Sequence, residues 1–134
     1  MELLDTAREL GSQLQLDDSY IDYNIAKQNY ELDKELQEQV EKFNLTKVEI
    51  NYEISKQNPD QKKLEELNQK LNNLYNELMK NENMKTYNET KSKLNDLLGK
   101  IMIILNGSAE GEDPFSINVD KMCSGSCSSC QGCN

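Results

Sequence analysis

The fold of this chain is decided by one stretch, NPDQKKLEELNQKLNNLYNELMKN (residues 58–81). Asn58 is a good helix N-cap, Pro59 suits the first helical position, and Gln61 stands three residues after the cap, as in a capping box. Lys, Glu, Asn and Gln separate leucines that recur at helical spacing, which predicts a narrow apolar seam of the kind that packs in a helical hairpin or coiled coil. The leucines of this seam are Leu64, Leu67, Leu71, Leu74 and Leu78.

The residues before the leucine seam also follow helical spacing. Apolar residues recur at intervals of three and four from Leu3 to Leu14, and Asp17-Asp18 then offers an N-cap for the next helix. Asp33 either caps a further helix or lies inside one long helix. Beyond it, a helix with two apolar faces is predicted, and such a helix usually touches more than one neighbour. The first face is Leu36, Val40, Phe43, Ile50 and Ile54, broken at Lys47, and the second is Leu45, Val48 and Tyr52.

A last helix is predicted after a break at residues 81–83. It runs through residues 84–105, with Asn106-Gly107 as its stop. Its end, residues 101–105, is apolar all round, so this turn must be deeply packed or form an assembly surface. We therefore expect an all-α fold, a long antiparallel helical hairpin with one or two N-terminal helices packed on it and a flexible Cys-rich tail behind it.

Composition excludes several classes of function. The chain has 134 residues, 24 acidic and 15 basic side chains, a net charge of −9 and no histidine. Without histidine, serine–histidine and cysteine–histidine catalysis and mixed Cys/His zinc sites are excluded. Carboxylate pairs such as Glu65-Glu66 fit a solvated helix face, so we expect no enzyme activity. The acidic charge argues against direct nucleic-acid binding.

No segment of the sequence points to a membrane or to export. The chain has no uninterrupted apolar run of about 20 residues, so no membrane span is expected. Its first residues, Met1 to Asp5, lack the basic start and apolar core of a signal peptide. We therefore expect a cytoplasmic protein, in which cysteines are reduced thiols or metal ligands rather than disulfides.

All four cysteines lie within the last twelve residues, and this crowding is the sharpest feature of the composition. Thiolates suit zinc, copper(I) and iron–sulfur clusters. So compact a run is closer to the ligand runs of iron–sulfur proteins than to the two separated knuckles of a structural zinc site. A redox-sensitive tail that binds stray metal remains the alternative. The candidate ligands are Cys123, Cys127, Cys130 and Cys133.

The composition changes near residue 106. We expect a helical domain over residues 1–106 and a flexible tail over residues 107–134, whose Cys-rich end binds a metal or cluster. The tail holds four of the six glycines and carries little helical pattern.

Several segments occur in one characteristic order. Leu14-Gln15-Leu16 ends the first helix, DDSYIDYNIAK (residues 17–27) follows, and Asp33 starts a helix that contains Phe43. The Asn-Pro-initiated leucine helix, the helix from Asn81 through Tyr87 and the Cys/Gly/Ser-rich end complete the order. This order resembles the YlbF/YmcA family of small helical bacterial regulators, and the crowded terminal cysteines resemble its YlbF branch.

The resemblance implies a non-enzymatic regulatory subunit in a cytoplasmic complex with YmcA-like and YaaT-like proteins. That complex carries iron–sulfur clusters and modulates mRNA processing by the membrane-anchored endonuclease RNase Y. Through it, the complex affects competence, sporulation and biofilm formation. Such a subunit is expected to be a homo- or hetero-oligomer.

The resemblance also implies that the four terminal cysteines ligate a [4Fe–4S] cluster, with zinc as the alternative. A second interpretation rests on the residues alone. In it, the chain is a metal-binding or storage protein, or a structural helical protein, with a metallothionein-like Cys tail.

Overall fold

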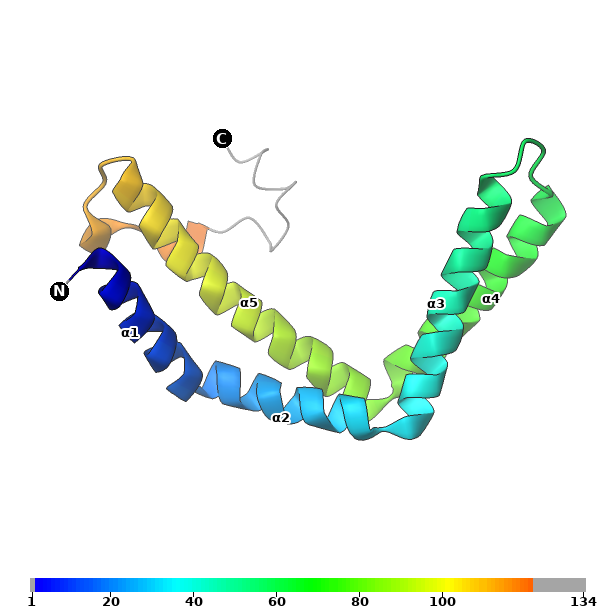
Figure 1. Ribbon diagram of the computed structural model, residues 1–134, viewed down its shortest axis with the longest axis horizontal. Coiled ribbons are helices and arrows are strands. Elements are labelled where there is room, and N and C mark those ends of the chain that lie inside the picture. Colours follow the sequence, from blue (N-terminus) through cyan, green and yellow to red (C-terminus); the bar gives the residue numbers. More distant parts are fainter. Residues whose placement is uncertain (1, 122–134) are drawn as a thin grey trace. The chain divides into compact units, whose positions relative to one another are not determined.

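The computed structural model describes residues 2–121 (Figure 1). The part of the chain that it describes is helical and contains no strand, so the all-α prediction is confirmed. Five α-helices are followed by two short 3-10 turns. They are α1 (Leu3–Leu16), α2 (Asp18–Leu32), α3 (Lys34–Ile54), α4 (Gln61–Lys80), α5 (Glu82–Ala109), η1 (Pro114–Ser116) and η2 (Val119–Lys121).

The chain divides into two compact units. One unit comprises residues 24–89 and contains α3 and α4 with the adjoining parts of α2 and α5. The other unit combines the N-terminal residues up to Tyr23 with the residues from Thr90 onward. It contains α1, the larger part of α5 and both 3-10 turns.

The predicted hairpin is formed by α3 and α4, which lie side by side and reverse direction across residues 55–60 (Figure 1). The leucine seam faces this contact. Leu67 and Leu78 are buried, and the other three seam leucines are half-buried, whereas most residues between them are exposed. Leu36 and Ile50 of α3 are buried as well, so burial of apolar side chains on both arms stabilises the hairpin.

The buried face of α3 differs from the predicted one at three positions. Thr46 and Glu53 are buried, whereas the predicted Ile54 is 58% exposed. The hydroxyl of Thr46 donates to the carbonyl of Lys42 at 2.8 Å, and this satisfies its polar atom inside the hairpin. Glu53 is compensated by lysines at the end of the hairpin. The apolar pattern did not reveal these two positions because both residues are polar.

Short polar side chains begin several helices. Asp17 accepts a hydrogen bond from the amide of Ser19 at 2.9 Å, and Asp33 accepts one from the amide of Leu36 at 3.0 Å. The predicted cap at Asp17 is confirmed, and of the two alternatives at Asp33 the structure shows the one in which this residue caps a separate helix. At the predicted break of residues 81–83, Asn81 accepts from the amide of Met84 at 3.1 Å and caps α5.

The predicted start of the leucine helix at Asn58-Pro59 is wrong. The helix begins at Gln61, and its N-cap is Asp60, whose carboxylate accepts from the amides of Lys62 and Lys63. The amide of Asp60 itself donates to the carboxylate of Glu53 at 3.0 Å. This bond holds Asp60 in an extended conformation outside the helix, a long-range contact that the local sequence does not show.

The last helix ends later than predicted. It continues through Asn106-Gly107 to Ala109, three residues beyond the expected boundary at 106. The chain then reverses at Gly111, whose φ of +92° suits glycine, and the amide of Glu112 donates to the carbonyl of Gly107 at 3.0 Å. Gly107 therefore does not stop the helix and is instead the residue against which the chain folds back.

The segment after α5 lies back along the end of that helix. A Cβ atom added at Gly107 would come within 2.7 Å of Cδ1 of Ile117, so a larger residue here would force the Ile117 side chain to move. Farther back on α5, Nζ of Lys100 lies 3.9 Å from a carboxylate oxygen of Asp120. Residues 110–121 thus form a return segment whose local structure is defined.

Candidate functional site

The four cysteines predicted to bind a metal or cluster, Cys123, Cys127, Cys130 and Cys133, lie outside the described residues. Their ligand role stays a prediction. Within residues 2–121, no three acidic or sulfur-bearing side chains come together in a way that would hold a metal ion. In the described part of the chain, the candidate sites are therefore polar clusters and exposed apolar faces.

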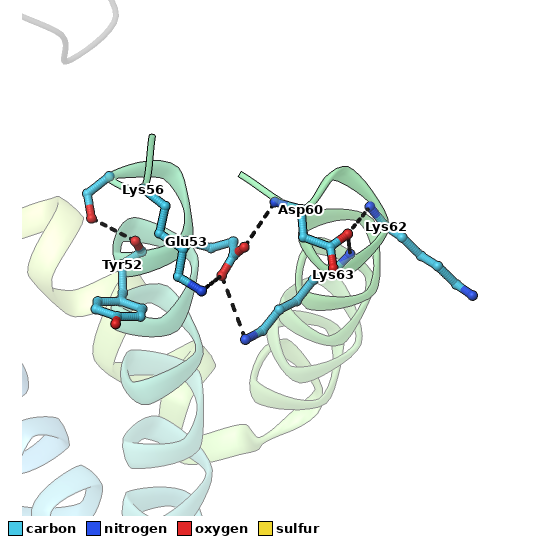
Figure 2. A network of polar contacts seen from close by, with 7 residues as sticks. Tyr52, Glu53, Lys56, Asp60, Lys62 and Lys63 are labelled. Carbon is cyan, nitrogen blue, oxygen red and sulfur yellow. Dashed lines mark hydrogen bonds and ion pairs between the residues drawn. The ribbon is translucent and has the colours of Figure 1, made fainter. Parts of the chain in front are cut away.

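Glu53 is the centre of the polar cluster at the turn of the hairpin (Figure 2). Its side chain is buried at the end of α3. One carboxylate oxygen accepts from the amide of Asp60, and the other lies 2.8 Å from Nζ of Lys56 and 3.7 Å from Nζ of Lys63. The cluster joins the end of α3 to the start of α4.

The charges of this cluster suit a structural role. The hydrogen bond from Lys56 and then the amide of Asp60 lower the pKa of Glu53, and burial opposes them more weakly. The same contact with Glu53 raises the pKa of Lys56. A general acid or base needs a pKa near the working pH, and both shifts move away from neutrality. Glu53 therefore stays ionised and holds the turn, and it is not a candidate catalytic residue.

A second polar cluster lies at the opposite end of the hairpin, around Asp33. Besides capping α3, the Asp33 carboxylate accepts hydrogen bonds from the side-chain amides of Asn81 and Asn83 at 3.1 and 3.0 Å. The bond from the Leu36 amide, followed by those from Asn83 and Asn81, lowers the pKa of Asp33. The sequence indicated a cap at Asp33, but its contacts with residues 48 and 50 positions away left no signal in the local pattern.

Two tyrosines that are near the residues of the Asp33 cluster in the sequence stack on each other. The rings of Tyr30 in α2 and Tyr87 in α5 are 4.4 Å apart with an interplanar angle of 18°. The side chain of Gln37 donates to the carbonyl of Tyr30 at 2.7 Å. Together with Asp33, these contacts bind the end of α2 and the first part of α5 to the hairpin, so this end is fixed by specific contacts rather than by apolar burial alone.

The second apolar face predicted for α3 is exposed. Leu45, Val48 and Tyr52 are 54%, 63% and 66% exposed. A face of this kind on a surface rich in charged residues is typical of an interaction site.

Apolar side chains are also exposed on α1 and α5. Neither helix has a buried residue. At the end of α5, Met102 and Leu105 are about half exposed, so the apolar turn at residues 101–105 is not deeply packed. Of the two alternatives for this turn, the exposure favours an assembly surface.

The helices that carry these exposed faces match a known family over most of the chain. The sequence model of a family described as control of competence regulator ComK, YlbF/YmcA, matches residues 3–108. The chain belongs to the YlbF/YmcA family. The match starts at the first residue of α1 and ends one residue before the end of α5, so it takes in all of α1 to α4. The resemblance found in the sequence is thereby confirmed.

The description of the YlbF/YmcA family points to regulation, in the control of the competence regulator ComK. No curated protein and no solved structure matched this chain. The four cysteines lie beyond the matched residues, so family membership rests on the helices alone. In the described part of the chain, no helix combines the length and the hydropathy that a bilayer span requires.

Proposed function

We propose that this YlbF/YmcA-family chain is a non-enzymatic regulatory subunit that acts through protein partners in a cytoplasmic complex. The observation that carries the proposal is the exposure of apolar side chains on helices that belong to the family match. A long helix in water draws most of its stability from the burial of an apolar face. Helices α1 and α5 have no buried residue, so a partner that covers them would stabilise them.

The proposed partners are YmcA-like and YaaT-like proteins, and the proposed target of the complex is RNase Y. Modulation of RNase Y-dependent mRNA processing would then act on competence, sporulation and biofilm formation. The family description supports the link to competence. The net charge of −9 supports action through proteins, because a surface that grips RNA phosphates is basic.

The proposed cofactor is a [4Fe–4S] cluster held by the four terminal cysteines, with zinc as the alternative. Thiolates are the ligands that iron–sulfur clusters take from proteins. The two buried or half-buried carboxylates of the described chain, Glu53 and Asp33, already have lysine or amide partners. We therefore propose the four cysteines, rather than these two carboxylates, as the metal ligands of this chain.

Anaerobic co-purification tests the proposal. The full chain is produced with YmcA-like and YaaT-like proteins, and iron, acid-labile sulfide, zinc and the absorbance at about 400 nm are measured. We expect one complex that contains iron and sulfide. Replacement of all four cysteines by serine should remove both, whereas replacement of Ser124, Ser126, Ser128 and Ser129 by alanine should not.

Three outcomes would contradict the proposal. If the folded chain elutes apart from both partners, it is not a subunit of such a complex. Zinc or copper without iron and sulfide would contradict the [4Fe–4S] cluster, and a chain that carries such a metal without either partner would support the metal-storage alternative. RNA cleavage by the purified chain alone would contradict the non-enzymatic role.

A further inference from the structure

An aromatic ring stands almost fully in water on the return segment behind α5. Among the described residues, Phe115 is the most exposed large apolar side chain, at 98%. It is the middle residue of η1. The family match ends at residue 108, so the return segment lies beyond the residues on which family membership rests. Neither the helical packing nor the family description accounts for this ring.

The backbone that carries Phe115 is fixed by contacts on both sides. The carboxylate of Asp113 accepts hydrogen bonds from the amide of Phe115 at 3.2 Å and from the hydroxyl of Ser116 at 2.8 Å. Pro114 restricts the same turn, because its ring fixes φ. On the other side of Phe115, the side chain of Ile117 packs against the end of α5. The ring is therefore presented by an ordered turn.

The surroundings of Phe115 are acidic. Glu110 and Glu112 line a cleft between the return segment and the end of α5, together with Ser116, the residue after Phe115. Both glutamates are exposed, and within residues 2–121 neither carboxylate has an ion-pair or hydrogen-bond partner. Of the five charged residues in the segment, four are acidic and one is basic. They are Glu110, Glu112, Asp113, Asp120 and Lys121.

We propose that the return segment docks this chain onto a protein partner by inserting Phe115 into an apolar pocket whose rim carries lysine or arginine side chains. The inference rests on the proposed function, because it assigns the contact to one of the partner proteins of the complex. Aromatic anchors that fill a pocket dominate many protein interfaces. An anchor that is ordered before binding also loses less conformational entropy on association.

The charges select a basic protein surface as the occupant. Nucleic acids and anionic lipid surfaces are repelled by the carboxylates around Phe115. A second copy of the chain that used the same patch would set these carboxylates against one another, and like charges repel. A pocket with a basic rim satisfies both the apolar ring and the two unpaired glutamates.

Binding of the full chain to the purified YmcA-like and YaaT-like proteins tests the anchor, by anaerobic isothermal titration calorimetry. Phe115→Ala should weaken binding to one of them by about ten-fold or more. Phe115→Leu keeps an apolar side chain and should weaken it less. Leu32→Ala is the control, because it removes a 78% exposed apolar side chain from the end of α2 and should leave the affinity unchanged.

Hydrogen exchange separates the loss of the ring from a loss of order in the turn. The amides of residues 110–121 should exchange at the same rate in Phe115→Ala as in the wild type, because the exposed ring is not part of the packing against α5. If exchange is faster in this variant, the charge substitutions decide the matter instead.

The charge substitutions leave Phe115 in place. Glu110→Gln/Glu112→Gln removes both unpaired charges with little change in size and should weaken binding to the same partner. Added salt should weaken binding of the wild type more than binding of this variant. Glu65→Gln/Glu66→Gln removes the same charge from exposed positions of α4 and should have no effect.

Two failures can be told apart. If the wild type binds a partner and neither the Phe115 nor the glutamate substitutions weaken that binding, the docking proposal is overturned and the role as a subunit stands. Equal losses in Phe115→Ala and Leu32→Ala would overturn it as well. If the wild type binds neither partner, the proposed function and the docking proposal both fail.

Discussion

The carboxylate of Asp33 accepts a hydrogen bond of 3.0 Å from the side chain of Asn83, fifty residues further along the chain. The same carboxylate also caps α3. Asp33 thus connects the start of the hairpin with the start of α5, and it fixes two chain segments with one side chain. A local cap and a long-range contact are combined in a residue that the sequence marks only as a cap.

Replacement of Asp33 by alanine should lower the melting temperature more than replacement of Asp17. Asp17→Ala removes one cap bond, that to the Ser19 amide, and serves as the matched control. Asp33→Ala removes its cap bond and both asparagine contacts. Thermal unfolding followed by circular dichroism gives the two values. Equal losses would show that the long-range bonds add nothing to stability.

Acid should destabilise the hairpin through Asp33 and Glu53. The pKa of each carboxyl is lower in the folded chain than in the unfolded chain, so the unfolded state binds protons first as the pH falls. Their contribution is present above the unfolded values and is lost below about pH 4. The melting temperature should therefore fall steeply in this range. In the Asp33→Asn/Glu53→Gln double variant, the melting temperature should fall less steeply with pH. If the pH profile of this variant matches that of the wild type, the two carboxyls do not account for the acid sensitivity.

The loss of stability when a leucine of the hairpin is replaced by alanine should increase with the burial of that leucine. Leu36→Ala should cost about 2–5 kcal/mol, the range for a fully buried leucine. Leu71 is half-buried, so Leu71→Ala should lower the free energy of unfolding by less. Leu45 lies on the exposed second apolar face of α3, so Leu45→Ala should change the free energy of unfolding by no more than about 0.5 kcal/mol. Urea unfolding at low protein concentration measures all three, and a larger loss at Leu45 than at Leu36 would mean that α3 packs by its other face.

The Gly107→Ala variant should loosen the return segment without destabilising α5. Alanine gains about 1 kcal/mol over glycine inside a helix, so α5 itself should not be destabilised. The new methyl group would displace Ile117 and loosen residues 110–121. Limited proteolysis should therefore cut this segment faster in the variant, while the melting temperature holds. Unchanged cleavage would mean that Ile117 adjusts in place.

The sequence predicted the parts of the fold that depend on local patterns. The leucine seam, the cap at Asp17 and the break at Asn81 follow from spacing or from capping chemistry, and the structure confirms them. At Asp33 the sequence left open whether this residue caps a new helix or lies inside a long one, and the structure shows the cap. The second apolar face of α3 was also visible in the sequence.

Features that depend on distant contacts were missed or misplaced. The cap at Asp60 depends on its bond to Glu53, and the burial of Glu53 depends on two lysines, one of them in the next helix. The close approach of Ile117 to Gly107 joins two residues that are ten positions apart. The sequence pattern also left open which helix pairs with the leucine seam. The cysteine site rests on spacing and family resemblance, because it lies outside the described residues.

The central claim, regulation of RNase Y-dependent processing through the cysteine-bearing subunit, is tested most directly by mapping transcript ends. Cells that lack this chain receive the wild type, the variant with all four cysteines changed to serine, or the control in which the tail serines are changed to alanine. The account predicts that the wild type and the control restore the processed ends, and that the cysteine variant does not. Identical transcript ends with and without the chain would contradict it.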